Sequence, residues 1–335
     1  MIISSSLKSR FCTDCKIPID LYHEPYFTER LKLYDKFYGT LEKYDLFVRE
    51  LQNYNYEQVY FEDYNRVKDE AINSIKNSEA FQRFNEEDMN KYCFKNNGIS
   101  SNNIFHPANS ERLFLSIDMK KANFSALHHY DAGMFSGAST WEEFLRLFTN
   151  NKHIINSKYI RQAILGNCNP KKHITFEKCL MDGVLSVMNE IIPIGSVVSF
   201  TNDEIVYDLL KGGFDINDLY NTQEFLDKNI NTVPLKAEVF ALHKINGTEG
   251  YYKEIIDKDG KVDIEFKCLD SNMLPFVIRK FCEEEVTEND KVFYHKGLLA
   301  KYFETPEIEV NLNGNYNQDS FRSKYFDSYA SGQWA

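Results

Sequence analysis

The chain has 335 residues, of which 43% are hydrophobic and 27% are charged. This composition is ordinary for a folded protein and excludes a chain that is disordered throughout. The length favours two or three subdomains. The net charge of −11 argues against a simple nucleic-acid coat protein, because such a protein is usually basic.

Cysteine usage and hydropathy indicate the compartment. The seven cysteines are scattered and form no disulfide framework. No window approaches the roughly 20 apolar residues of a membrane span. We therefore expect a soluble, intracellular protein with no membrane partner. Cys12 and Cys15 have the spacing of a zinc knuckle, but no second such pair exists, so zinc and ordinary thiols both stay open.

The first third of the chain has a helical pattern. Apolar residues recur every three or four positions over residues 26–53, and a second helical pattern covers residues 57–93. Neither segment carries a catalytic motif. We predict a helical N-terminal subdomain over residues 1–105, a catalytic core over 106–270 and a C-terminal segment over 271–335.

The core opens with an apolar run from Leu113 to Ile117, which is typical of a fully buried strand, and this run ends at Asp118. Ser157 and Thr175 are expected to cap two of the helices that follow. Residues 166–173 are predicted to form a polar, basic loop. The predicted helices cover residues 120–130, 140–149, 157–165 and 175–191.

A β-hairpin is predicted next. Its apolar strands cover residues 196–200 and 205–209, and the acids Asp203 and Glu204 lie at its tip. An acidic helical stretch near 215–228 follows. Further strands are expected over 233–245, 250–256 and 261–269, with a hairpin turn at 257–260. The predicted fold class is α+β, with an antiparallel sheet packed against helices and a helical N-terminal subdomain.

Three acidic residues interrupt these apolar runs. A carboxylate at the end of a buried strand is costly unless something pairs with it. Asp118 and Asp203, brought together from different strands, would suit Mg²⁺ or Mn²⁺, as in phosphoryl transfer. Glu204 follows Asp203 directly, so an extended strand turns it to the other face and makes it an accessory group. The alternative is that these acids are merely exposed strand ends.

The two acidic segments resemble motifs of the palm of right-hand nucleic-acid polymerases. Ser116-Ile-Asp-Met-Lys-Lys-Ala-Asn-Phe124 is similar to motif A. Thr201-Asn-Asp-Glu-Ile-Val-Tyr207 looks like motif C, closest to the His-Asp-Glu-Ile-Val pattern of family A DNA polymerases, with Asn202 in place of His. The two aspartates lie 85 positions apart, a compact spacing more like reverse transcriptases. The resemblance covers roughly residues 110–270.

The resemblance also implies residues that bind substrate. It places either Asn123 or Phe124 at the steric gate beneath the sugar of the incoming nucleotide. It places a fingers segment after the first motif, where two basic pairs would contact the triphosphate or the template. A solvated basic face is the competing interpretation. The basic residues are Lys158, Arg161, Lys171 and Lys172.

The resulting hypothesis is a template-dependent nucleotidyltransferase. Asp118, Asp203 and Glu204 are its catalytic residues, and Asp118 and Asp203 are its metal ligands. Its partners would be a nucleic-acid template and primer, nucleoside triphosphates and a protein that supplies basic surface, in the cytoplasm or a viral replication compartment. The alternatives are a catalytically inactive, palm-derived interaction protein and a metal-dependent nuclease. The sequence leaves open the choice between DNA and RNA.

Overall fold

The computed structural model describes residues 3–92, 98–99, 103–209, 221–256 and 262–310. It combines helices with an antiparallel sheet, so the predicted α+β class is confirmed. No described helix is long and apolar enough to cross a membrane. Contacts divide the chain into a helical unit (Met1–Met89, Ala126–Ile174 and Ser271–Pro306) and a sheet unit (Asn90–Ser125, Thr175–Asp270 and Glu307–Ala335).

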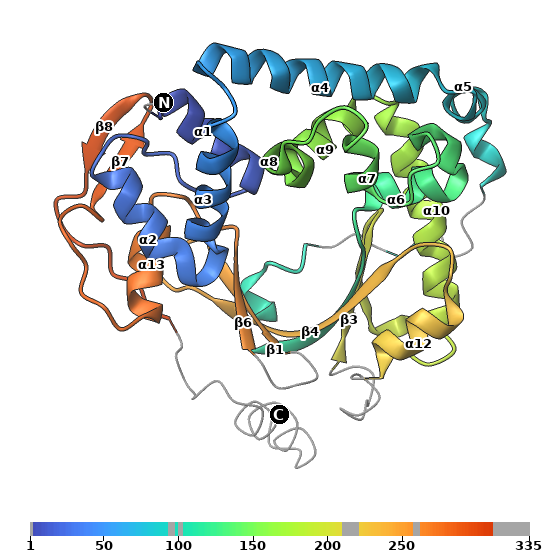
Figure 1. Ribbon diagram of the computed structural model, residues 1–335. Helices are drawn as coiled ribbons and strands as arrows, with labels where there is room; N and C mark the ends of the chain where they lie inside the picture. The colour runs from blue at the N-terminus through green and yellow to red at the C-terminus, as the bar shows by residue number, and fades with distance from the viewer. Residues whose placement is uncertain (1–2, 93–97, 100–102, 210–220, 257–261, 311–335) are drawn as a thin grey trace. The chain divides into compact units, whose positions relative to one another are not determined.

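The helical unit contains the helices near the N-terminus, several short helices from the middle of the chain, and a late helix with a small hairpin (Figure 1). Its described elements are α1 (Ser5–Cys15), α2 (Tyr26–Tyr38), α3 (Thr40–Leu51), α4 (Glu57–Asn77), α5 (Glu79–Glu86), η3 (Ala132–Phe135), α7 (Trp141–Leu145), α8 (Lys152–Asn156), α9 (Lys158–Gly166), α13 (Leu274–Phe281), β7 (Val292–His295) and β8 (Leu298–Lys301).

The predicted helix over residues 26–53 is divided in two. Gly39 ends α2 with a φ of +56°, a left-handed conformation that glycine adopts without a steric cost, and α3 begins at the next residue. The periodicity of apolar residues continues across the break, so it could not reveal the boundary. Ser157 caps α9 as predicted, because its side chain accepts a hydrogen bond from the amide of Ile160.

A buried carboxylate joins four helices of this unit. Asp14 in α1 is fully buried. It accepts hydrogen bonds from the hydroxyls of Tyr64 in α4, at 2.7 Å, and Ser157, at 3.0 Å. Nε2 of His153 in α8 lies 3.1 Å from its second oxygen. These partners offset the cost of removing the carboxylate from water, which explains how a charge is tolerated in this core.

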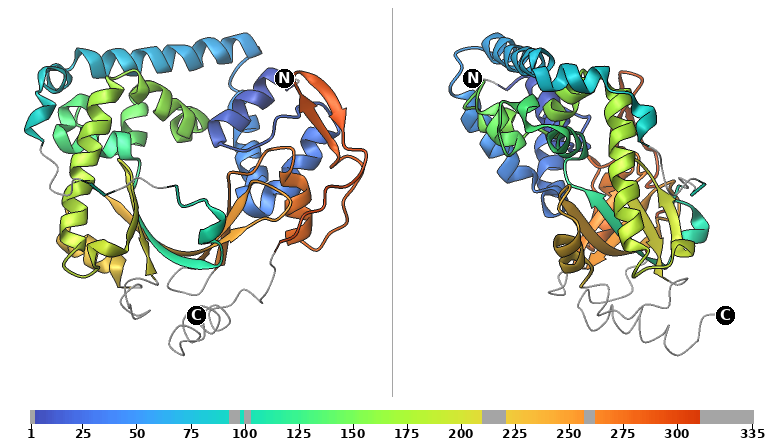
Figure 2. Two further views of the ribbon diagram at one scale, coloured as in Figure 1. Left: turned by 180° about the vertical axis from the view of Figure 1, so that it is seen from behind. Right: turned by 90° about the vertical axis from the view of Figure 1, so that its right-hand side faces the viewer.

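The sheet unit is built on one curved, six-stranded sheet, which Figure 2 shows from two further sides. Its strand order is β2-β3-β1-β4-β5-β6, and all neighbours are antiparallel. The bounds are β1 (Arg112–Met119), β2 (Val197–Phe200), β3 (Glu204–Asp208), β4 (Leu235–Lys244), β5 (Tyr251–Ile256) and β6 (Val262–Lys267).

Helices connect the strands of this sheet. α6 (Ala122–Tyr130) and α10 (Pro170–Met188) come between β1 and β2, and α12 (Thr222–Asn229) comes between β3 and β4. β3 lies between β1 and β2, and β1 lies between β3 and β4. The first four strands therefore form two interleaved β–helix–β units, an arrangement called split βαβ.

The apolar pattern of each strand explains the burial of the sheet. In β1, Leu113 to Ile117 are all buried, as the uninterrupted apolar run predicted. One face carries a hydrophobic cluster some distance along β1 from Asp118. Its buried members are Ile104, Phe114, Val206, Phe240, Leu242 and Tyr251. Asp118 lies beyond this cluster, near the end of the central strand β1, and this end of the central strands is called the acidic edge below.

One predicted loop is wrong. α10 begins at Pro170, so Lys171 and Lys172 are helical, and Thr175 lies inside the helix instead of capping it. Proline suits the first position of a helix, where its missing N–H is not needed. The basic run that suggested a loop is the first turn of a helix. The predicted turn at 257–260 and the start of the helical stretch near 215 lie outside the described residues.

Candidate functional site

Three acidic residues meet at one end of the central strands. Asp118 in β1 and Glu204 in β3 are register partners, so their side chains project from the same face of the sheet. Asp203 directly precedes β3, and its carbonyl accepts a hydrogen bond of 2.8 Å from the amide of Met119. Residues 85 positions apart in the sequence therefore become neighbours. The register also places Glu204 on the same face of the sheet as Asp118. Glu204 therefore lies closer to Asp118 than its predicted accessory role suggested.

Mutual repulsion among these carboxylates is visible in Asp118. Burial, the largest cause, and the charges of Asp203, Glu204 and Glu238 together raise its pKa to about 6, against the opposing effect of Lys236. Like charges disfavour each other's ionised form, and a nearby cation favours it. A bound cation would therefore reduce the repulsion among these carboxylates.

Hydroxyl groups orient two of the acids. Oγ of Ser116, two residues before Asp118 and on the same face of β1, donates a hydrogen bond of 2.6 Å to Oε1 of Glu204. Oγ1 of Thr201 donates one of 3.1 Å to Oδ1 of Asp203. Thr201 also accepts from the amide of Glu204 at 3.0 Å, which closes the hairpin turn. These bonds limit how far the carboxylates can rotate.

β4 adds charges that the sequence analysis did not include. Lys236 is the register partner of Asp118, and Glu238 is that of Ser116, so both lie on the face of the acids. Lys236 pairs with Glu238, whose carboxylate also lies 4.0 Å from Nζ of Lys253. The sequence contained one signal for these two residues. Lys236 and Glu238 alternate with apolar residues, which places both on one face of the predicted strand, but this pattern does not indicate which strand lies beside it.

α10 contacts the turn that carries Asp203. Nζ of Lys178 donates hydrogen bonds to the carbonyls of Phe200, at 2.7 Å, and Thr201, at 3.1 Å, and lies over the Phe200 ring. Burial lowers the pKa of Lys178 to about 8, although Asp182 partly opposes this. Oε2 of Glu177 accepts a hydrogen bond of 2.7 Å from Nδ2 of Asn202.

The two candidates for the steric gate differ in exposure. Asn123 and Phe124 lie in the first turn of α6, shortly after Asp118. Phe124 is only 6% exposed and belongs to the packed interior, whereas Asn123 is partly exposed. Asn123 is therefore the more accessible of the two to a molecule from solution.

The predicted phosphate-binding cations belong to the helical unit, whereas the three acids belong to the sheet unit. Lys158 is exposed at the start of α9, and Lys171 is exposed in the first turn of α10. Nζ of Lys172 donates to the carbonyl of Glu87 at 2.6 Å, so it supports the end of α5. Burial lowers the pKa of Arg161, whose Nε has no hydrogen-bond partner among the described residues.

The donor set at the acidic edge fits a hard divalent cation that completes its coordination shell with water or phosphate oxygens. Among the described residues, no group of three or more His, Cys, Asp or Glu side chains is arranged to hold a metal ion by itself. Mg²⁺ usually takes one or two carboxylates and completes its shell with water and phosphate oxygens. The repelling carboxylates of Asp118 and Asp203 are consistent with this incomplete kind of site.

The two N-terminal cysteines, Cys12 and Cys15, lie in α1 of the helical unit. Cys12 is buried, and burial raises the pKa of its thiol. Burial likewise raises the pKa of Cys15 to about 12. Burial therefore favours the protonated form of both thiols in the metal-free protein, and zinc and ordinary thiols both stay open at this pair.

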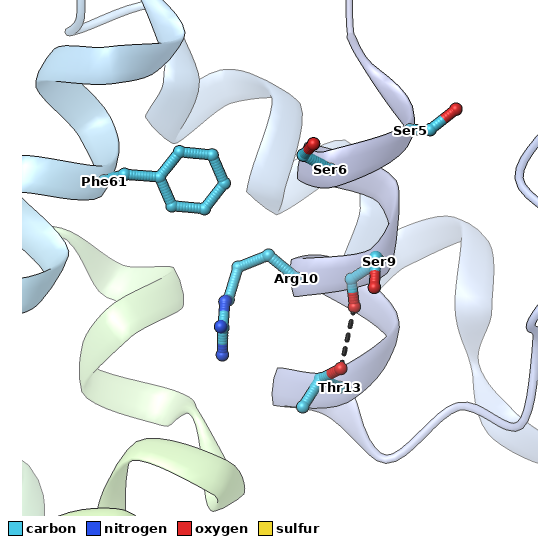
Figure 3. Close-up of a pocket in the computed structure, with 6 residues that line it drawn as sticks. All are labelled: Ser5, Ser6, Ser9, Arg10, Thr13 and Phe61. Carbon is cyan, nitrogen blue, oxygen red and sulfur yellow. Dashed lines mark hydrogen bonds between the residues drawn. The ribbon is translucent and has the colours of Figure 1, made fainter.

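A hollow of about 450 Å³ lies beside α1 in the helical unit (Figure 3). Nη1 of Arg10 in its wall lies 3.8 Å from Asp14, and the guanidinium lies over the rings of Tyr64 and Tyr159. Ser5 points away from that guanidinium. The charge of Arg10 thus faces that of Asp14, although its Nε and Nη1 have no hydrogen-bond partner among the described residues. The lining residues are Ser5, Ser6, Ser9, Arg10, Thr13 and Phe61.

Comparisons with protein-family models, curated proteins and solved structures found no match to this chain.

Proposed function

We propose that this chain is a template-dependent nucleotidyltransferase that joins nucleotides at the acidic edge of its sheet. The observation that carries the proposal is the register of β1 and β3, which places Asp118 opposite Glu204 and next to Asp203. The interleaved strand order supports it, because a palm-like core requires acids from a central strand and from a neighbouring hairpin to meet at one edge.

Each nearby group has a role in this proposal. Asp118 and Asp203 would hold Mg²⁺ or Mn²⁺, with Glu204 beside them. The bound ions would stabilise charge on the attacking and leaving oxygens of a phosphoryl group. Ser116 and Thr201 keep the carboxylates of Glu204 and Asp203 oriented before substrate binds.

Charge at the same edge also suits a phosphorylated substrate. Lys236 is exposed directly opposite Asp118, where its ammonium group can attract a phosphate oxygen. Asn123, the accessible candidate for contact with the sugar, can hydrogen-bond a hydroxyl group. Together these residues favour a nucleoside triphosphate that brings its own metal-binding oxygens.

Primer extension tests the proposal directly. The full chain is offered deoxynucleoside and ribonucleoside triphosphates separately, on DNA and on RNA templates, with Mg²⁺ or Mn²⁺. We expect incorporation by the wild-type protein and incorporation no higher than the no-enzyme background in Asp118→Asn and Asp203→Asn. Asp227→Asn in α12 is the matched control, because Asp227 is an exposed acid of the sheet unit whose hydrogen bond among the described residues is a local one with Gln223.

The same reactions separate the alternative functions. Shortened primers would indicate a metal-dependent nuclease instead. No reaction under any combination, together with no binding of metal or nucleotide, would favour an interaction protein. Full incorporation by Asp118→Asn would contradict the role assigned to Asp118.

A further inference from the structure

We propose that α10 positions the catalytic turn, with Lys178 and Glu177 holding the three residues that precede Asp203 in the geometry needed to bind a divalent cation. This inference rests on the proposed function, because it assigns positioning residues to the same acidic edge. Neither residue is predicted to touch a metal ion or a substrate.

Lys178 contacts the backbone at the start of the turn. Its ammonium group bonds the carbonyls of two consecutive residues, Phe200 and Thr201, where β2 ends. The same group lies over the Phe200 ring, an arrangement in which a cation is attracted to the face of an aromatic ring. One side chain therefore fixes both the backbone and the side chain at the entrance to the turn.

Glu177 contacts the residue directly before Asp203. It is 1% exposed, and Oε2 accepts the hydrogen bond from Nδ2 of Asn202. Asn202 is adjacent to Asp203, so any change in its backbone moves that aspartate. Two adjacent residues of α10 thus contact three successive residues of the turn, and this pattern anchors the turn to a helix.

The turn transmits this anchoring to the acids. Thr201, which Lys178 holds, donates to the carboxylate of Asp203 and accepts from the amide of Glu204. Asp203 in turn accepts the amide of Met119 next to Asp118. A continuous set of hydrogen bonds therefore runs from α10 to Asp203 and Glu204 and to Met119, the residue that follows Asp118. Groups that orient metal ligands typically affect metal affinity about 10–100-fold when they are removed.

The test is Mn²⁺ binding to the full chain, measured by electron paramagnetic resonance of the free ion. We expect Lys178→Met to weaken Mn²⁺ binding at least about tenfold. Lys178→Arg, which keeps a cationic donor, should restore most of the affinity. Lys228→Met is the matched control, because Lys228 is exposed in α12 and should leave the affinity unchanged.

A second pair of variants keeps the test decisive if Lys178→Met fails to fold. Asn202→Ala removes the bond to Glu177 and should weaken Mn²⁺ binding, whereas Glu177→Gln keeps an acceptor oxygen and should weaken it less. A merely structural role would lower the thermal midpoint of both Lys178→Met and Asn202→Ala and leave their Mn²⁺ affinity at the wild-type value, and that result would overturn the inference.

The reference variant Asp203→Asn separates the two proposals. If the wild-type protein binds Mn²⁺ and Asp203→Asn does not, the acidic edge holds the metal. In that case, unchanged Mn²⁺ affinity in both Lys178→Met and Asn202→Ala rejects only the role of α10. If Asp203→Asn binds as well as the wild-type protein, the metal site of the proposed function is wrong, and the inference about α10 falls with it.

Discussion

Asp118 is a carboxylate whose folded environment favours its protonated form. Its pKa of about 6 lies above the ordinary value of 3.8, first because of burial and then because of the charges of Asp203, Glu204 and Glu238. Lys236, opposite it on β4, reduces this effect. A raised pKa means that the group stabilises the fold when protonated, and that this contribution disappears as the pH rises through about 6.

The charge of Asp118 should therefore destabilise the metal-free protein at neutral pH. At about pH 7.5, we expect Asp118→Asn to raise the free energy of unfolding, by a fraction of the ~1.4 kcal/mol that corresponds to one pKa unit, because the partly exposed group is screened by solvent. At about pH 4 the two proteins should be nearly equal. Urea unfolding at both pH values measures the difference.

Asp227→Asn is the control for this experiment and should change the unfolding free energy by less than about 0.5 kcal/mol at either pH, because Asp227 is exposed. A loss of stability in Asp118→Asn at about pH 7.5 would contradict the electrostatic account.

The same titration predicts weaker Mn²⁺ binding as the pH falls below about 6, since a protonated carboxylate is a poor metal ligand.

Among the secondary-structure elements, the boundary between α2 and α3 depends on a single backbone position. α2 and α3 carry one continuous apolar pattern, but Gly39, with its left-handed φ of +56°, separates them. In α10, Gly183 lies in mid-helix, is exposed, and has open space where a Cβ would stand. Glycine is therefore expected to favour the stability of the fold at position 39 and to reduce it at position 183.

We expect the same substitution at these two glycines to shift stability in opposite directions. Gly39→Ala forces an L-residue into the left-handed region and should cost about 1–2 kcal/mol of unfolding free energy. Gly183→Ala should add about 0.5–1 kcal/mol, because alanine favours a helix interior. Urea unfolding of the two variants beside the wild-type chain measures both. A stabilising Gly39→Ala would show that the break between α2 and α3 does not need a positive φ.

At the scale of the whole molecule, each unit is assembled from segments far apart in the sequence. In the helical unit, Arg30 of α2 pairs at 2.7 Å with Asp290, and both side chains are buried. Arg30 also donates to the carbonyl of Asn289 at 3.2 Å. The residues that satisfy this buried arginine therefore come from the last tenth of the described chain.

A fragment of residues 1–105 is consequently expected not to unfold cooperatively by itself. It retains Arg30 without Asp290, and removing one partner of a buried ion pair costs about 3–5 kcal/mol, close to the whole stability of a small domain. Thermal unfolding followed by circular dichroism measures this against the full chain. A sharp transition in the fragment would show that its helices need no later segment.

The prediction of the fold from sequence succeeded where the signal was local. The uninterrupted apolar run predicted β1, the two apolar runs around Asp203 predicted the β2–β3 hairpin, and both are confirmed. It failed where a polar pattern has two interpretations. Lys171 and Lys172 suggested a loop but lie in the first turn of α10, because polar residues can stand at a partly exposed helix end as well as in a loop.

The candidate site shows the same division. By itself, the sequence determined that Asp118, Asp203 and Glu204 would interrupt buried strands, because burial follows from the neighbouring apolar residues. Only the tertiary structure decided that Glu204 lies opposite Asp118, that Lys236 shares their face, and that Lys178 holds the turn. Strand register and helix packing depend on contacts between distant segments, and no local pattern in one segment specifies its partner.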